Sequence, residues 1–160
     1  MRAQIQGGVQ CRRSFYRLSL SPQAVLWQSS PVTLIAQTVP QQEPPLSPSQ
    51  SAIIQQKIAT LHAAGERNIA QSWSNAKKVG EVICRPEALR TLKKKNPGID
   101  KVFLGTSDPT SLALESNERL TGTGQYRIGH QWTNFTFTCD LNPNNGKASG
   151  FQIVPLPAKQ

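Results

Sequence analysis

The sequence predicts an α+β fold, in which two or three N-terminal helices pack on one face of a small antiparallel β-meander. Three observations lead to this class. Residues 119–154 hold three segments rich in Val, Thr and aromatic residues, and apolar positions alternate with polar ones, as in half-buried strands. Clusters of Gly, Pro and Asn separate these segments. Upstream, between residues 51 and 95, apolar residues recur at helical spacing, so helices are available to cover the sheet.

The first two predicted strands, 119–128 and 132–141, are joined by the pair Gly129-His130. A Gly-X pair suits a two-residue type II′ turn, because glycine adopts a positive φ at little cost. Such a turn sets the register of the hairpin. It places two glycines opposite two aromatic rings and a leucine opposite a cysteine: Gly122 faces Phe137, Gly124 faces Phe135, and Leu120 faces Cys139.

The third predicted strand covers residues 147–154 and follows the turn NPNNG at 142–146. If Leu141 pairs with Lys147, two apolar pairs form on one face: Phe137 with Phe151, and Phe135 with Ile153. The apolar face comprises Leu120, Tyr126, Phe135, Phe137, Cys139, Leu141, Phe151 and Ile153. The opposite face is polar, which is common in antiparallel sheets. The apolar face therefore needs a cover of helices.

The helical pattern divides into three predicted segments. The first begins near Ser51 and ends at Gly65, and the second covers residues 66–84. The second carries an apolar stripe that faces the sheet: Ile69, Trp73, Ala76, Val79 or Gly80, and Ile83. The third begins at Arg85, with proline in its first turn, and ends at Lys95 before the stop signal Asn-Pro-Gly.

The domain is predicted to cover residues 50–156, with residues 157–160 as a tail. Residues 1–49 are rich in Gln, Ser and Pro and form a leader or a disordered extension. Within the domain, residues 99–104 are a further predicted strand. Residues 111–116 stay open between a helical turn and a loop.

The leader contains a basic segment from Arg12 to Arg17, which is similar to the start of a secretory leader. The longest apolar run after it is short, from Ala24 to Trp27, whereas a signal peptide needs about 7–15 apolar residues. Three interpretations stay open: an atypical signal peptide, a misplaced start codon, and a disordered extension. We expect no transmembrane segment, because a spanning helix needs a run of about 18 or more apolar residues.

The chain has three cysteines. Cys84 ends the second predicted helix, and Cys139 points from the middle strand toward the apolar face that this helix covers. A disulfide between them is geometrically natural, and it indicates an oxidising compartment such as the periplasm or the outside. The alternative is a pair of reduced cysteines in a cytosolic core. Cys11 lies in the leader, and its role is open.

The net charge of +9 is distributed unevenly. Residues 66–101 carry about +5 and residues 102–160 about zero, so the predicted sheet is neutral and the helices are basic. This balance permits anionic partners such as nucleic acid, phospholipid or lipopolysaccharide. Lys93, Lys94 and Lys95 either stabilise the end of a helix through its dipole or contact phosphate or anionic lipid.

One surface of the predicted sheet is a candidate binding site. In the proposed register Arg127 pairs with Trp132, which suggests a cation–π contact, and Asn134 and Thr136 lie beside this pair. An exposed tryptophan among amides and hydroxyls could bind a sugar or a glycan. The alternative is structural, with Trp132 packed under the segment 105–116.

Several kinds of chemistry are not predicted. Gly122-Thr123-Gly124 lies within a strand and does not open a helix, so it lacks the context of a dinucleotide site. The chain has no pair of cysteines at metal-ligand spacing, and neither His62 nor His130 has ligand spacing around it. We expect no metal and no cofactor.

Several short patterns follow one another in the second half of the chain. They are a helix ending in Val82-Ile83-Cys84, a short helix with Ala88-Leu89, the segment from Pro97 to Val102, GTGQYR at 122–127, W-x-x-F-x-F-x-C at 132–139, and Phe151 after a turn. With these patterns, residues 66–154 resemble a proteobacterial family known as domain of unknown function 930. The resemblance implies an exported envelope protein and no particular activity. The chain departs from the family in lacking a clean signal peptide.

These observations favour an exported, non-enzymatic binding or structural module of the cell envelope, periplasmic or secreted. Its expected partner is an anionic envelope component or a glycan. The first alternative is a cytoplasmic basic protein that binds nucleic acid through Lys77, Lys78 and Lys93–Lys95. The second is a small hydrolase, in which His130 or His62 would meet carboxylates in a pocket.

Overall fold

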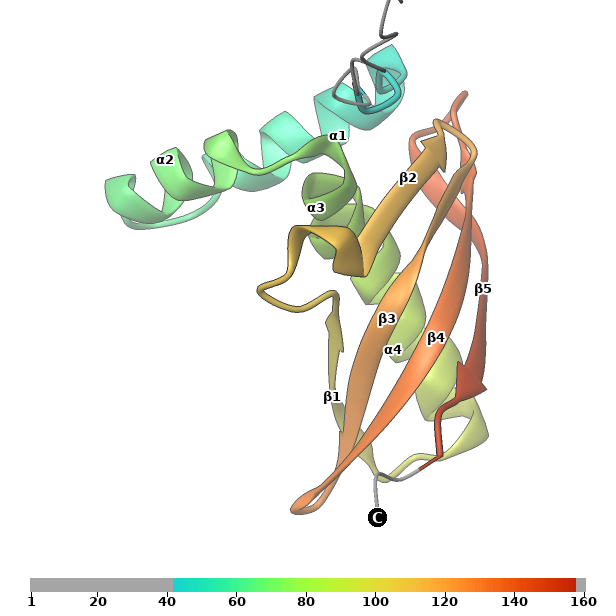
Figure 1. The fold of residues 1–160 in the computed structure, drawn as a ribbon. Helices are drawn as coiled ribbons and strands as arrows, with labels where there is room; N and C mark the ends of the chain where they lie inside the picture. The colour runs from blue at the N-terminus through green and yellow to red at the C-terminus, as the bar shows by residue number, and fades with distance from the viewer. Residues whose placement is uncertain (1–41, 158–160) are drawn as a thin grey trace, which may run out of the picture. The chain divides into compact units, whose positions relative to one another are not determined.

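The computed structural model describes residues 42–157. The expectations for the leader before residue 42, for Cys11 and for the end of the tail lie outside the described residues. Within them, helices precede strands, and the α+β class is as predicted (Figure 1). The helical elements are α1 (Pro48–Ala59), α2 (Ala64–Ser72), α3 (Asn75–Val79), the π-helical turn η1 (Gly80–Cys84) and α4 (Arg85–Lys95). The strands are β1 (Ile99–Leu104), β2 (Leu112–Ser116), β3 (Arg119–Ile128), β4 (Gln131–Asn142) and β5 (Lys147–Pro155), and the 3-10 turn η2 (Pro109–Ser111) precedes β2.

The second predicted helix, 66–84, is wrong as a single element. The chain leaves the helix at Trp73, whose backbone is extended (ψ 151°), and Ser74 begins a new helix by accepting a hydrogen bond from the Lys77 amide. Serine is a preferred N-cap residue, so this break has a local cause. Ile69 was assigned to the buried stripe, but it is 62% exposed because it lies on α2, before the break.

The first helix begins three residues before the predicted start. Ser47 caps it with both halves of a capping box: its hydroxyl accepts from the Gln50 amide, and the Gln50 side chain accepts from the Ser47 amide. Further upstream, the Glu43 carboxylate accepts from two amides at the start of α3. Part of the segment 1–49, which the sequence predicts to be a leader or a disordered extension, therefore contacts the domain.

The strand order is β1-β3-β4-β5, and β2 pairs with β3 on the same edge as β1. β1 pairs with the second half of β3 and β2 with the first half, so both complete one edge of the sheet (Figure 1). The segment 111–116 therefore contains a strand, where the sequence left a helical turn or a loop open.

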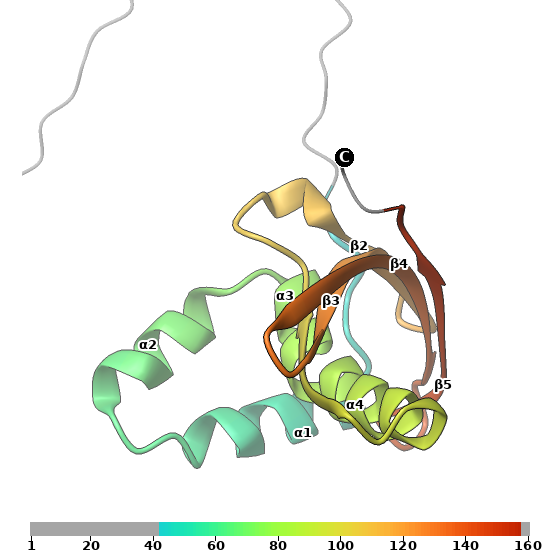
Figure 2. The ribbon, with the colours of Figure 1, turned by 90° about the horizontal axis from the view of Figure 1, so that it is seen from below.

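The sheet is curled, and it wraps around the helical segment from α3 to α4 (Figure 2). α4 contacts both β1 and β5, so this helix closes the gap between the two edges of the sheet. The core lies between the helices and the inner face of the sheet. Its fully buried side chains include Val79, Cys84, Leu104, Leu120, Phe135 and Cys139.

The predicted register of β3 and β4 is confirmed. Leu120 pairs with Cys139, Gly122 with Phe137 and Gly124 with Phe135. Gly129 has φ +58°, and among the described residues only glycines have positive φ, so His130 has negative φ. This combination is that of a type II′ turn, because a type I′ turn would need positive φ at both positions.

Gly124 shows why a glycine faces an aromatic ring here. A Cβ atom at this position would lie 2.7 Å from the Phe103 carbonyl oxygen and 2.7 Å from Cζ of Phe135. Both distances are far inside van der Waals contact. The missing side chain therefore lets the Phe135 ring lie across β3 into the core.

The predicted register of β4 and β5 is wrong by two residues. Phe151 pairs with Cys139 and Ile153 with Phe137. One residue of the shift arises at the turn, where Asn142 rather than Leu141 pairs with Lys147, and a bulge at Ser149 on β5 adds the second. A bulge places two residues of one strand opposite one residue of its neighbour. The shift over most of the hairpin is even, so Phe151 and Ile153 still point to the inner face.

The predicted disulfide is present. Cys84, the last residue of η1, is bonded to Cys139 in the middle of β4, with a Cα–Cα distance of 6.1 Å. Both residues are fully buried. The bond therefore joins the helix to the sheet within the core.

Candidate functional site

A cluster of aromatic and charged side chains lies on the outer face of the sheet. Trp132 on β4 stacks on Phe103 of β1, with ring centroids 5.5 Å apart and planes 29° apart. The Arg127 guanidinium on β3 lies 5.5 Å from the Trp132 ring centroid, as predicted. Trp132 is 43% exposed and Phe103 is 41% exposed. We call Asp100, Phe103, Arg127 and Trp132 the outer cluster.

An ion pair holds Arg127 in place. Its guanidinium donates two hydrogen bonds to the Asp100 carboxylate on β1, one of them from Nε to Oδ1 at 3.0 Å. Through these hydrogen bonds, Arg127 lowers the pKa of Asp100, and Asp100 raises the pKa of Arg127. The pair therefore favours the charged forms of both groups, and the carboxylate orients the guanidinium that lies against the indole.

Polar side chains surround the cluster, as the sequence predicted. Asn134 on β4 is exposed and pairs with Gln125 of β3. Thr136, one row further, is half-buried, and its hydroxyl lies 3.5 Å from the Val154 carbonyl oxygen. These amides and hydroxyls form rows that begin beside the indole. Trp132 is 43% exposed, and the ring that stacks on it is Phe103 of β1 rather than a residue of the segment 105–116.

Sequence reasoning missed three apolar side chains on this face. Phe103, Val154 and Leu156 are exposed, and strand pairing brings all three to the outer face. Phe103 alternates with the buried Val102 and Leu104, which is the signal that could have identified it. That signal needed the pairing of β1 with β3, and the sequence alone did not supply it.

A groove of about 510 Å³ lies beside the outer cluster, between α4 and β1. Asp100 and Phe103 line both the groove and the cluster. Its remaining lining residues are Arg85, Pro86, Leu89, Lys101 and Val102. The groove therefore offers mainly apolar contacts, together with one carboxylate and two basic side chains.

The three lysines Lys93, Lys94 and Lys95 end α4, as predicted, and all are exposed. None of them forms an ion pair with another described residue. Their position at the C-terminus of the helix is favourable for the helix dipole, so the structural interpretation holds. In this position the ammonium groups of Lys93, Lys94 and Lys95 can still bind a partner.

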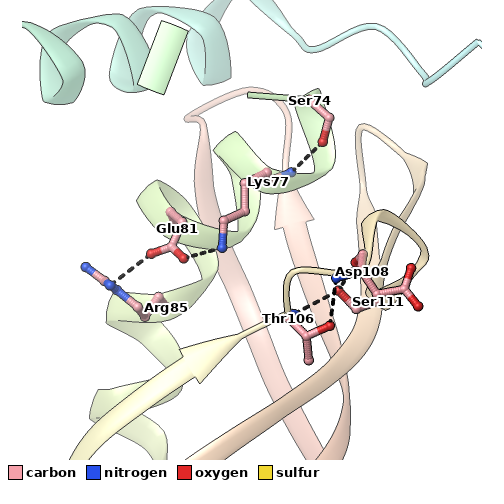
Figure 3. A network of polar contacts seen from close by, with 7 residues as sticks. All are labelled: Ser74, Lys77, Glu81, Arg85, Thr106, Asp108 and Ser111. Atoms are coloured by element: carbon pink, nitrogen blue, oxygen red, sulfur yellow. Dashed lines mark hydrogen bonds and ion pairs between the residues drawn. The ribbon is translucent and has the colours of Figure 1, made fainter. Parts of the chain in front are cut away.

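The other predicted basic residues are engaged differently. Lys77 donates to Glu81 at 2.7 Å and lies over the Trp73 ring, and Arg85 pairs with the same carboxylate at 2.9 Å (Figure 3). On the loop before β2, Thr106, Asp108 and Ser111 bind one another, and no dashed contact joins them to the helix (Figure 3). Lys78 lies about 20 Å from Lys93 along the helical segment, at about 1.5 Å per residue. These lysines therefore do not form one continuous basic surface.

Neither histidine meets carboxylates in a pocket. His62 is exposed between α1 and α2, and His130 is exposed in the β3–β4 turn. Between residues 42 and 157, no group of three His, Cys, Asp or Glu side chains is placed to hold a metal ion. No helix in this part of the chain combines the length and apolar character needed to cross a membrane.

Comparisons of the chain with models of known protein families, with curated proteins and with solved structures find no match. The fold class is defined by the geometry itself: helices packed against a five-strand, curled antiparallel sheet, joined by a buried disulfide. The site is defined in the same way, as an exposed aromatic and charged cluster on the outer face of that sheet.

Proposed function

We propose that the protein is an exported, non-enzymatic binding module of the cell envelope, which binds a glycan on the outer face of its sheet. The disulfide supports an oxidising compartment, because such bonds persist in oxidising environments. The resemblance to the family of unknown function supports export, and it stays a prediction.

The observation that carries the proposal is the state of Trp132. The indole is 43% exposed, and it stacks on Phe103 while the Arg127 guanidinium lies against it. A ligand that stacks on a ring already held in place loses little conformational entropy on binding. Sugars present apolar C–H faces to such rings and hydroxyls to amides, and Asn134 and Gln125 supply amides beside the ring.

The test is binding of purified peptidoglycan and of delipidated core oligosaccharide, measured by calorimetry. We expect Trp132→Ala to weaken binding by about tenfold or more, a loss of about 1.4 kcal/mol or more. Gln152→Ala is the matched control, because Gln152 is exposed on the same face but pairs with Thr138, away from the outer cluster. Its affinity should equal that of the wild type.

Two results would contradict this proposal. One is a wild-type protein that binds neither probe. The other is a Trp132→Ala variant that keeps full affinity while its thermal unfolding is unchanged. If Trp132→Ala loses both affinity and much of its stability, the Phe103→Ala variant separates the two effects. It removes the ring that stacks on Trp132 but keeps the indole itself.

The two alternatives find less support. Nucleic-acid binding would use Lys77, Lys78 and Lys93–Lys95 together, but Glu81 neutralises Lys77 and the two groups lie about four turns of helix apart along the segment, at about 3.6 residues per turn. Hydrolysis would need a histidine close to carboxylates, and both histidines are exposed on connections. We therefore propose no second function.

A further inference from the structure

Three parts of the chain lie at one end of the domain. They are the C-terminus of α4, the turn that follows it, and the tip of the β3–β4 hairpin (Figure 1). A Cβ atom on Gly98 of that turn would lie 3.4 Å from Cγ2 of Ile128 at the hairpin tip. The turn therefore links the end of α4, which carries Lys93–Lys95, to the hairpin tip at the same end of the domain (Figure 1). We call this end of the domain the basic end.

The lysines at the basic end point in different directions. Consecutive residues of an α-helix lie about 100° apart around the axis, so three of them cover about 200°. Lys93, Lys94 and Lys95 therefore surround the end of α4 and do not form a stripe along its side. A flat anionic surface that approaches along the helix axis can contact all three, whereas a rod lying along the helix cannot.

Charge is separated along the sheet. The basic end has Lys93–Lys95, Lys101 and Arg127, with Asp100 as the carboxylate paired to Arg127. The opposite end, where β2 turns into β3, has the carboxylates Glu115, Glu118 and Asp140, with Arg119 and Lys147 near them. An anionic surface would therefore attract one end of the domain and orient it.

Apolar side chains accompany the lysines. Ile128 at the hairpin tip is 37% exposed, and Trp132 follows it across the turn, opposite Arg127. Tryptophan is enriched where proteins meet the interface of a membrane, since its ring has an apolar body and a polar N–H group. Exposed apolar side chains with flanking lysines are typical of surfaces that lie on anionic lipid.

We propose that the basic end docks on an anionic lipid bilayer, with α4 pointing its C-terminus at the headgroups and Ile128 at their level. The phosphates of the lipid would contact the lysines around the end of α4. This inference rests on the proposed function and deepens it, because it names the surface on which the module acts. The docked domain would hold the outer cluster close to the bilayer, where envelope glycans are anchored.

The experiment measures sedimentation of the full chain with vesicles of phosphatidylglycerol and phosphatidylethanolamine, and with neutral phosphatidylcholine vesicles. The variant replaces Lys93, Lys94 and Lys95 by Gln. We expect each lost lysine to weaken binding to anionic vesicles by about fivefold, and the three together by about a hundredfold. Neutral vesicles should bind the wild type weakly, and added salt should release it from anionic ones.

The matched control replaces three lysines elsewhere, Lys57, Lys78 and Lys147, by Gln, which gives the same change in net charge. These residues lie on α1, on α3 and at the start of β5. Circular dichroism of both variants checks that the helices are intact. We expect the control to lose far less affinity than the basic-end variant.

Equal losses in the two variants would overturn the inference, because they would indicate attraction by net charge alone. It would also be overturned if the wild type bound a double-stranded oligonucleotide in preference to the vesicles at the same salt. Loss of glycan binding in Trp132→Ala without any vesicle binding would sink this inference and leave the proposed function standing. Vesicle binding without glycan binding would do the reverse.

Discussion

Replacing Cys84 and Cys139 by alanine is expected to lower the free energy of unfolding by about 4 kcal/mol. The bond closes a loop with a sequence separation of 55, and the unfolded chain loses the corresponding entropy when the loop is closed. Both sulfurs are fully buried, and the bond joins the last residue of η1 to the central strand β4. Its loss should therefore weaken the contact between helix and sheet as a whole.

Urea denaturation of the double variant measures this effect. Wild-type protein in excess reductant is the control, since reduction breaks the link but keeps both sulfur atoms in the core. We expect the control to lose most of the same free energy, and the difference between the two to report the packing of the sulfurs. An unchanged unfolding midpoint in both samples would show that the link does not hold helix and sheet together.

Phe135→Ala is expected to cost about 3–5 kcal/mol, the range found for removing a large buried aromatic side chain. Phe135 is fully buried, and its ring lies between Tyr126 and Phe137, with centroid distances of 5.9 and 6.3 Å. Gly124 has no side chain to fill the space that the ring would leave. The cavity would therefore stay open to a large extent.

Phe103→Ala is the matched control for this variant, because it removes the same side chain from the outer face of the same sheet. Phe103 is 41% exposed, so we expect a cost of about 1 kcal/mol, mostly from the lost stacking on Trp132. Chemical denaturation of both variants gives the comparison. Similar costs for the two phenylalanines would contradict the assignment of an inner and an outer face.

The hairpin of β3 and β4 could be predicted from the sequence to the residue. A two-residue turn leaves no freedom in register, and the positions of Gly122 and Gly124 agreed with the two phenylalanines opposite them. The disulfide followed from the same register, because it placed Cys139 on the inner face under the helix that ends at Cys84. Turn geometry was sufficient here because the connection between β3 and β4 is only two residues long.

The β4–β5 hairpin and the helix break could not be predicted in the same way. A longer turn leaves the register open, and the bulge at Ser149 on β5 changes the pairing by an amount that the alternation of apolar residues does not reveal. The break at Trp73 is specified by the cap at Ser74, but Ile69 fitted the helical period well enough to conceal it. The hydrophobic periodicity predicts one continuous helix, whereas the N-cap at Ser74 predicts a break, and the structure has the break.

The candidate site was predicted in its centre and missed at its edges. Arg127 and Trp132 are neighbours within the hairpin whose register was known. Asp100 and Phe103 come from β1, whose partner strand depends on a connection of many residues, so their part in the site needed the structure. The same limit applies to Leu156, which joins the face through the hydrogen bond of its amide to Asn134.

Peptide mapping of the protein as isolated from its native host, alkylated before any reductant is added, tests the central claim most directly. The proposed function places this protein in an oxidising compartment, where the disulfide joins η1 to β4. It predicts that the peptides containing Cys84 and Cys139 are recovered as one linked species, which separates on reduction. Recovery of both cysteines as alkylated thiols would contradict the bond in its native setting, and with it the proposed export.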